Sequence, residues 1–107
     1  MRRGDVFAFR RQGRDANGHE QLGARLAVVV GADEFRWLAT VTVVPTSTSG
    51  EGASFRPRVT AGGRTTRLLV DQISTVDRSR IGRRVGQLRP ADLREVEDIR
   101  GLYLGLL

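Results

Sequence analysis

The stretch that decides the fold runs from Ala24 to Val44 and reads ARLAVVVGADEFRWLATVTVV. Its first part, Ala24–Val30, is apolar and β-branched and stops at Gly31, which is typical of a buried strand. In its last part, Trp37–Val44, valines and threonines alternate, which predicts a strand buried on one face. Pro45 is expected to end this second strand. Two such strands in succession predict the centre of a β-sheet.

Short β-prone segments lie on both sides of this centre. Asp5–Phe9 precedes it, and the polar, glycine-containing stretch Arg10–Gly23 between them is expected to be a long loop. Ser54–Thr60 follows the centre, and Pro57 inside it places this strand at a sheet edge. The remaining expected elements are a turn at Gly62–Gly63, a strand at Arg67–Val70 that residues 71–76 can extend, a helical turn at Asp77–Arg80 capped by Asp77, and a strand at Arg83–Leu88.

A helix of several turns is expected only at the end of the chain. Pro90 stands where the first residue of a helix tolerates proline, and apolar residues then recur at spacings of three and four. This stripe, which we expect to serve core and dimer packing, consists of Leu93, Val96, Ile99, Leu102, Tyr103, Leu106 and Leu107. The sequence therefore predicts a single domain over residues 1–107 that is mainly β with a C-terminal helix, folded as a small, partly closed barrel.

Composition excludes several classes of protein. The 107 residues include no cysteine and one histidine, His19, which argues against a disulfide framework and a Cys/His zinc site. No spacing of histidines and carboxylates suggests a metal centre, and no nucleotide-binding glycine motif occurs, so we expect neither metal nor cofactor. The sequence shows no signal peptide and no apolar run of membrane-spanning length, which predicts a soluble, cytoplasmic protein.

Positive charge is concentrated in two parts of the chain. All 18 basic residues are arginines, and the formal net charge is +6. Residues 1–14 carry a net charge of +4 and residues 56–89 one of +7, whereas residues 91–100 carry −2. Guanidinium groups are planar, two-pronged donors to phosphate, so this distribution suits a polyanionic partner. Composition alone is equally consistent with a merely solvated surface. A protein this small builds a cleft most easily between two copies, which favours a homodimer.

Elimination leaves a restricted chemistry. Without metal ligands or a Gly-x-Ser-x-Gly elbow, the available groups are hydroxyls, carboxylates, one histidine and many arginines. This set suits cleavage of RNA, because RNA carries its own nucleophile in the 2′-OH. The protein then supplies a proton acceptor, a proton donor and cations that stabilise the charged phosphorus intermediate.

Several blocks of sequence occur in a recognisable order. They are Arg3–Gly4–Asp5–Val6, Gly18–His19–Glu20–Gln21–Leu22–Gly23–Ala24–Arg25, Val44–Pro45–Thr46–Ser47–Thr48, and Asp71–Gln72–Ile73–Ser74–Thr75–Val76–Asp77 with the strand after it. Together they resemble the MazF/PemK family of toxin endoribonucleases from bacterial toxin–antitoxin pairs. The resemblance covers nearly the whole chain. One departure is Leu26, which stands where the family normally has a proline after the arginine.

The resemblance implies an SH3-like barrel of the CcdB/PemK type that dimerises and binds single-stranded RNA across the dimer surface. It implies a sequence-selective, metal-independent endoribonuclease that leaves a 2′,3′-cyclic phosphate and a 5′-OH, inhibits translation and growth, and is neutralised by a small acidic antitoxin. Arg25 takes the position of the catalytic arginine, and Glu20 that of a loop glutamate that could act as base. The active hydroxyl falls on Ser47, with Thr46 and Thr48 as neighbouring alternatives. Residues expected to contact RNA are His19, Gln21, Thr46, Arg56, Asp71 and Gln72.

Two other functions remain open at this point. A protein of the same fold could act without catalysis by poisoning DNA gyrase, as CcdB does. A plain RNA-binding module would bind RNA and leave its length unchanged. The block from His19 to Arg25 argues against the gyrase-poisoning alternative, and a cleavage assay distinguishes the nuclease from the binding module.

Overall fold

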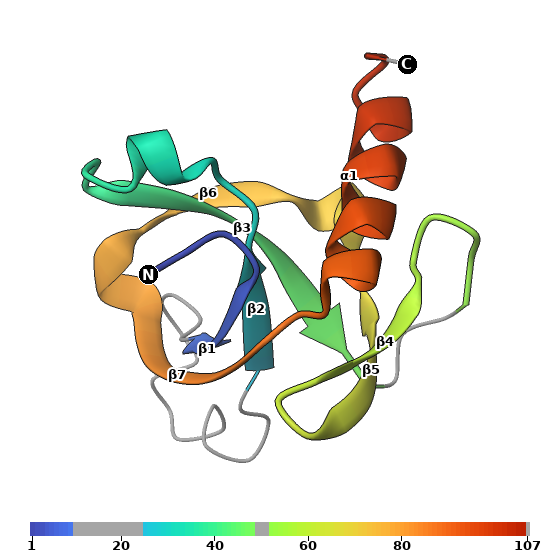
Figure 1. Cartoon of the computed structure of the whole chain (residues 1–107), viewed down its shortest axis with the longest axis horizontal. Helices are drawn as coiled ribbons and strands as arrows, with labels where there is room; N and C mark the ends of the chain where they lie inside the picture. The colour runs from blue at the N-terminus through green and yellow to red at the C-terminus, as the bar shows by residue number, and fades with distance from the viewer. Residues whose placement is uncertain (10–24, 49–51, 107) are drawn as a thin grey trace.

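The strands of this chain form one antiparallel sheet that curls into a half-barrel, with the only helix of the described chain at its end (Figure 1). A computed structural model describes residues 1–9, 25–48 and 52–106. The sheet order is β4-β5-β3-β2-β1-β7, and β6 also pairs with β3. The elements are β1 (Asp5–Phe9), β2 (Arg25–Val29), η3 (Asp33–Phe35), β3 (Thr40–Ser47), β4 (Arg58–Ala61), β5 (Arg64–Leu68), η4 (Val70–Gln72), β6 (Ser74–Asp77), η5 (Arg78–Arg80), β7 (Ile81–Gln87) and α1 (Pro90–Tyr103), where η marks a 3-10 turn. The prediction of a mainly β fold with a C-terminal helix is confirmed.

Strand β3 is the centre of the sheet and continues past Pro45, so the prediction that this proline ends the strand was wrong. In an antiparallel strand the N–H and C=O of one residue point to the same edge. The Pro45 carbonyl accepts a 2.9 Å hydrogen bond from the Leu69 N–H on the edge that β6 and β5 share. Pairing to β6 ends at Val43 and pairing to β5 begins at Thr46, so the missing N–H of Pro45 falls between the two partners.

Other strand boundaries also differ from expectation. Strand β3 begins at Thr40 rather than Trp37, because residues 36–38 form a turn whose carbonyls accept hydrogen bonds from Arg78. Strand β7 begins at Ile81, and β5 covers Arg64–Leu68. Residues 71–76 do not extend β5, since the N–H groups of Gln72 and Ile73 close a 3-10 turn onto Leu69 and Val70.

Several local predictions are confirmed. Strand β1 has the predicted bounds, and β4 is the predicted edge strand, although it covers Arg58–Ala61 and not Ser54–Thr60 and so excludes Pro57. Gly62 and Gly63 form the β4–β5 turn with φ angles of 59° and 79°, a left-handed conformation that glycine adopts at little cost. The Asp77 carboxylate accepts a 2.9 Å hydrogen bond from the Ser79 N–H and so caps η5.

Two apolar clusters fill the two faces of the curled sheet. The first includes Val28, Val44 and Leu68 and is covered by α1 through Val96, with Leu93 and Ile99 packed at its margin. The second, on the opposite face, includes Phe7, Ala27, Val29, Val41, Val43 and Val76. The apolar stripe of α1 thus serves the core only in its first half.

The second half of the stripe does not pack in the core of this chain. Leu102, Tyr103 and Leu106 are exposed, as is Leu104, and Leu107 lies outside the described residues. Of the expected core and dimer packing, core packing therefore applies only to the first half of the stripe, and dimer packing by Leu102, Tyr103 and Leu106 stays a prediction. In the described part of the chain, no helix is long and apolar enough to cross a bilayer.

Candidate functional site

The predicted catalytic arginine and hydroxyl come together at one end of two neighbouring strands. Arg25 is the first residue of β2 and Ser47 the last of β3, and both are half-buried. Strands β2 and β3 pair Val29 with Val43 and Ala27 with Pro45, and two further steps in this register bring Arg25 opposite Ser47. Directly opposite residues project from the same face of a sheet. The register therefore places Arg25 and Ser47 as cross-strand neighbours on one face of the sheet.

The two threonines beside Ser47 differ in their surroundings. Thr46 is buried and its hydroxyl donates a 3.1 Å hydrogen bond to the Leu26 carbonyl. This bond also shows that β2 and β3 remain in contact beyond the last paired residues. Because successive residues of a strand alternate between faces, Thr46 faces the core, away from Arg25. Thr48 follows β3 and is exposed. Of the three candidates, Thr46 thus faces the core, whereas Ser47 is half-buried on the face of Arg25 and Thr48 is exposed.

The predicted loop residues of the site lie outside the described residues. They are His19, Glu20 and Gln21, which precede β2. Their roles remain predictions that follow from the sequence alone.

Two residues that the sequence assigned separately to RNA contact are bound to each other. The Arg56 guanidinium donates two hydrogen bonds to the Asp71 carboxylate, at 3.0 Å from Nε and 2.7 Å from Nη2. These hydrogen bonds hold the pKa of Asp71 below its ordinary value of 3.8. Gln72, the next residue, is exposed. An RNA that reaches this region meets a neutralised ion pair, not an isolated cation.

Sequence reasoning did not single out two arginines that lie in line with Ser47. Ser47 pairs with Arg67 of β5, and Arg67 pairs with Arg58 of β4. The strand alternation in this hairpin carries the signal, since Val59, Thr66 and Leu68 are buried, whereas Arg58 is exposed and Arg67 half-buried beside them. Only the order of the strands, with β3 beside β5, brings these residues next to Ser47.

An aromatic residue of β1 lies beside Arg25, on the side away from Ser47. Phe9 is the partner of Arg25 in the β1–β2 register. The guanidinium of Arg80 stacks on the Phe9 ring at 4.6 Å from its centroid, which is cation–π geometry. The site thus has a stacked, half-buried ring at one side and arginines at the other.

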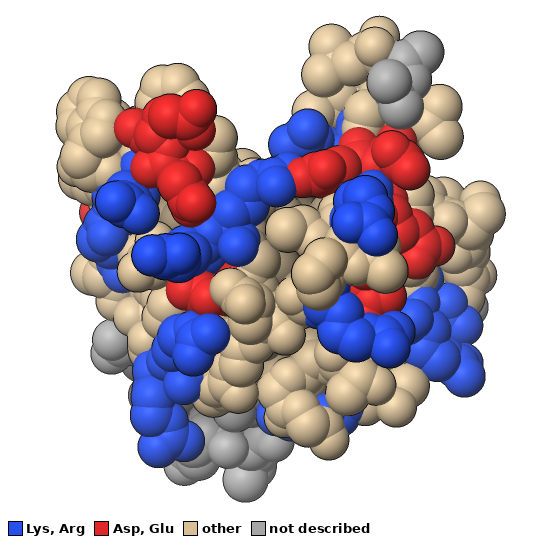
Figure 2. Space-filling model, viewed as in Figure 1, with Lys and Arg blue, Asp and Glu red and all other residues tan. Residues whose placement is uncertain are grey.

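Three arginines, Arg25, Arg67 and Arg58, bring positive charge to the strands around Ser47. Arginines appear over much of the visible face in Figure 2, and several of them contact carboxylates. In the described part of the chain, the ion-paired arginines are Arg3 with Glu97, Arg56 with Asp71, Arg84 with Asp5 and Arg89 with Asp92. None of these four pairs includes Arg25, Arg58 or Arg67. An anion with two or more oxygens, such as a phosphodiester, suits these groups.

The fold and the site together define a small, basic, antiparallel half-barrel with a candidate phosphate-binding site at the strand ends. Residues 2–99 match the family of PemK-like, MazF-like toxins of type II toxin–antitoxin systems. This match covers most of the chain, and the chain belongs to that family.

Relatives and solved structures agree with this assignment. The chain is 46% identical over 90 residues to a Mycobacterium tuberculosis protein named "Putative toxin Rv3098A", covering 83% of this chain and 84% of the relative. It is 31% identical over 112 residues to the "Probable endoribonuclease MazF" of Mycolicibacterium smegmatis, covering 99% and 98% of the two chains. A mycobacterial endoribonuclease solved in complex with its cognate antitoxin has the same fold, with a TM-score of 0.81 at 21% identity over 100% of this chain and 97% of its own. The predicted MazF-like fold is confirmed, and homologues of this chain are MazF endoribonucleases.

Proposed function

We propose that this protein is an endoribonuclease toxin that cleaves single-stranded RNA, including mRNA, and is neutralised in the cytoplasm by a small acidic antitoxin. The observation that carries the proposal is the adjacency of Arg25 and Ser47 at the same end of β2 and β3. The 31% identical MazF relative and the antitoxin-bound structure of the same fold support it. Cleavage of mRNA would inhibit translation and growth.

The proposed reaction needs no group that the chain lacks. The 2′-oxygen attacks the adjacent phosphorus while the bond from phosphorus to the 5′-oxygen breaks, which yields a 2′,3′-cyclic phosphate and a 5′-OH. One proton leaves the 2′-OH, for which Glu20 is the proposed acceptor, and one reaches the departing 5′-oxygen. Arg25 stabilises the charge that develops on the phosphate and is the proposed proton donor, and the Ser47 or Thr48 hydroxyl hydrogen-bonds a phosphate oxygen.

Purified protein incubated with a long transcript in excess EDTA tests this function. We expect discrete fragments whose 5′ ends accept a phosphate from polynucleotide kinase without prior dephosphorylation. A 2′-deoxynucleotide on the 5′ side of a mapped cut should block cleavage there, because the nucleophile is missing. Intact RNA that is nevertheless bound would identify a binding module instead. Intact RNA together with inhibition of gyrase supercoiling would identify a CcdB-like toxin.

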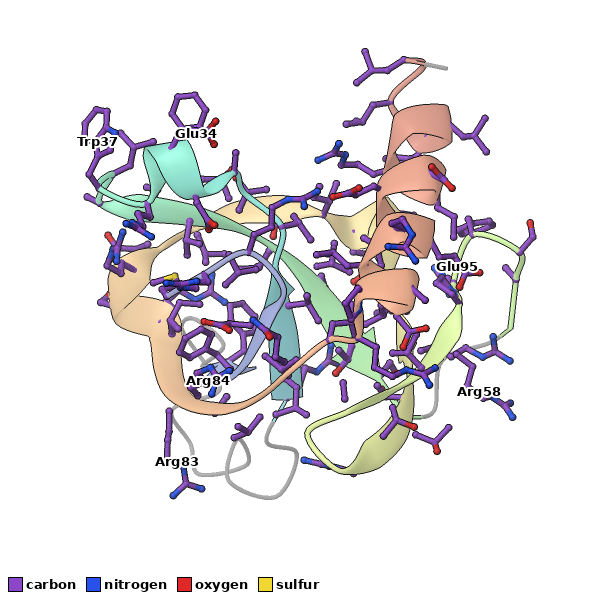
Figure 3. All side chains as sticks on the ribbon, in the orientation of Figure 1. Glu34, Trp37, Arg58, Arg83, Arg84 and Glu95 are labelled. Carbon is purple, nitrogen blue, oxygen red and sulfur yellow. The ribbon has the colours of Figure 1, made fainter. Side chains whose placement is uncertain are left out.

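We further propose that the active form is a homodimer that buries an exposed apolar surface around η3. Phe35 is 59% exposed and Trp37 75%, and the turn that carries them is fixed by the hydrogen bonds from Arg78. Figure 3 shows Trp37 at the outer end of the segment that contains η3, with Glu34 on the same segment. An acidic antitoxin is disfavoured next to Asp33 and Glu34, so a second copy of the chain suits this surface better.

Changing Trp37 to aspartate should shift the protein from dimer to monomer, since the substitution puts a charge where the proposed interface buries an aromatic side chain. Sedimentation velocity at micromolar concentration measures the change, and Arg83→Ala, an exposed charge on β7, is the matched surface control. A Trp37→Asp protein that sediments like the wild-type dimer would place the interface elsewhere.

A further inference from the structure

We propose that Arg67 and Arg58 extend the phosphate-binding site beyond the scissile phosphate, so that the RNA backbone crosses β2, β3, β5 and β4 perpendicular to the strands. This inference rests on the proposed ribonuclease function and adds to it the path of the substrate. We call Arg25, Ser47, Arg67 and Arg58 the arginine row.

The strand registers carry the inference. Ser47, Arg67 and Arg58 are consecutive cross-strand partners, and Arg25 joins them through the β2–β3 register. Leu26, Val59 and Leu68, which adjoin Arg25, Arg58 and Arg67 along their strands, belong to the first apolar cluster. Thr46, which precedes Ser47, is buried. All four side chains therefore project from the opposite face of the sheet. With about 4.8 Å between strands, the row spans about 14 Å, which is long enough for more than one phosphate.

Arg67 is held in position before any ligand binds. Its Nη1 donates a 2.8 Å hydrogen bond to the Arg56 carbonyl, and the residue is half-buried. A side chain at residue 52 would place its Cβ 2.7 Å from Nη2 of Arg67, so Gly52 leaves the space that the guanidinium occupies. A cation whose position is fixed in advance loses less entropy when it binds a phosphate.

Arg56 differs from Arg67 and Arg58 in that it is bound to a carboxylate. The charge of Arg56 is neutralised by Asp71, whereas in the described part of the chain Arg67 and Arg58 contact no carboxylate. Arg58 is exposed, and Figure 3 shows its side chain extending away from β4 into solvent. The row therefore ends in a cation that is free to follow a flexible strand of RNA.

The hairpin also offers a matched control. Arg64 lies on β5, three residues before Arg67, and is exposed. The alternation of β5 places it on the face opposite Arg67. Replacing Arg64 removes the same charge from the same hairpin without touching the row.

The test measures RNA binding against salt with an oligoribonucleotide that spans a mapped cut and carries one 2′-deoxynucleotide to block cleavage. Arg67→Ala and Arg58→Ala should each weaken binding about fivefold at low salt. Each should also reduce the magnitude of the slope of log K against log salt by about 0.7, the value for one lost contact to a single-stranded phosphate. Arg64→Ala should leave this slope unchanged. In cleavage assays on a long RNA, Arg67→Ala and Arg58→Ala should raise KM and leave kcat near the wild-type value.

The outcomes separate this inference from the function beneath it. A wild-type protein that neither binds nor cuts RNA overturns the proposed function. If the wild-type protein cuts RNA but Arg67→Ala and Arg58→Ala keep the wild-type slope, only the proposed path of the RNA over the arginine row is overturned. Arg58→Ala decides the matter if Arg67→Ala fails to fold, because no hydrogen bond within the described chain depends on the exposed Arg58 side chain.

Discussion

Replacing Arg25 with alanine is expected to slow RNA cleavage by about 100- to 1000-fold, which is the usual effect of removing one donor that stabilises a developing oxyanion. The guanidinium lies at the start of β2, beside the Ser47 hydroxyl and beyond the core. No ion pair within the described residues depends on it, so the fold should persist. Initial rates on a transcript with a mapped cut measure the effect, and circular dichroism checks the fold.

Two related variants make this prediction sharper. Arg25→Lys keeps the charge but not the two-pronged geometry, and we expect an activity between those of the wild type and the alanine variant. Arg64→Ala removes an arginine from the other face and should cut at the wild-type rate. An Arg25→Ala protein as active as Arg64→Ala would rule out the catalytic role.

The same assay identifies the active hydroxyl. Ser47 is half-buried opposite Arg25, whereas Thr48 is exposed one residue later. We expect Ser47→Ala to lose about tenfold in rate, because it removes a hydrogen bond to a charged phosphate, and Thr48→Ala to lose less. The reverse order would assign the role to Thr48.

The sequence predicted the fold well because its signals are local. The alternation of valine and threonine in 40–44, the glycine pair at 62–63 and Pro90 each determine the structure of their own neighbourhood. The predictions that were wrong concern segments whose structure depends on tertiary contacts. Pro45 is tolerated within β3 only because β6 and β5 share one edge of that strand, and no local pattern reveals this.

The site was predictable only in part for the same reason. Arg25 and Ser47 could be named from their motifs, but their adjacency depends on the β2–β3 register. The ion pair between Arg56 and Asp71 joins residues fifteen positions apart, and Arg67 reaches Ser47 because β5 lies beside β3. Charge counting treats all these arginines alike, whereas the structure separates those that contact carboxylates from those that do not.

Replacing Asp5 with asparagine is expected to destabilise the fold by about 2 kcal/mol at pH 7, since the amide cannot form the ion pair with Arg84 and has one acceptor oxygen fewer for the hydrogen bonds. Asp5 begins β1 and is 3% exposed. Its carboxylate accepts hydrogen bonds from the Arg2 N–H at 2.8 Å and the Gln87 amide at 3.1 Å, and it lies 3.1 Å from Nε of Arg84. These contacts join both ends of the β region, because Gln87 and Arg84 belong to β7.

The dependence on pH distinguishes the charge of Asp5 from its shape. Burial by itself raises the pKa of Asp5, but the hydrogen bonds from Arg2, Arg84 and Gln87 outweigh it and hold the pKa below 3.8. A carboxyl whose pKa is lower in the folded state stabilises the protein above its unfolded pKa, and this contribution disappears as the pH falls through the folded value. Urea unfolding of the wild type and Asp5→Asn should therefore differ most near neutral pH and converge below pH 3.8. A difference that stays constant down to pH 2 would mean that Asp5 acts by shape and neutral hydrogen bonding alone. Convergence would show that an ionised carboxylate at the start of β1 fastens this strand to β7, and β1 carries at its other end the Phe9 that lies against Arg25.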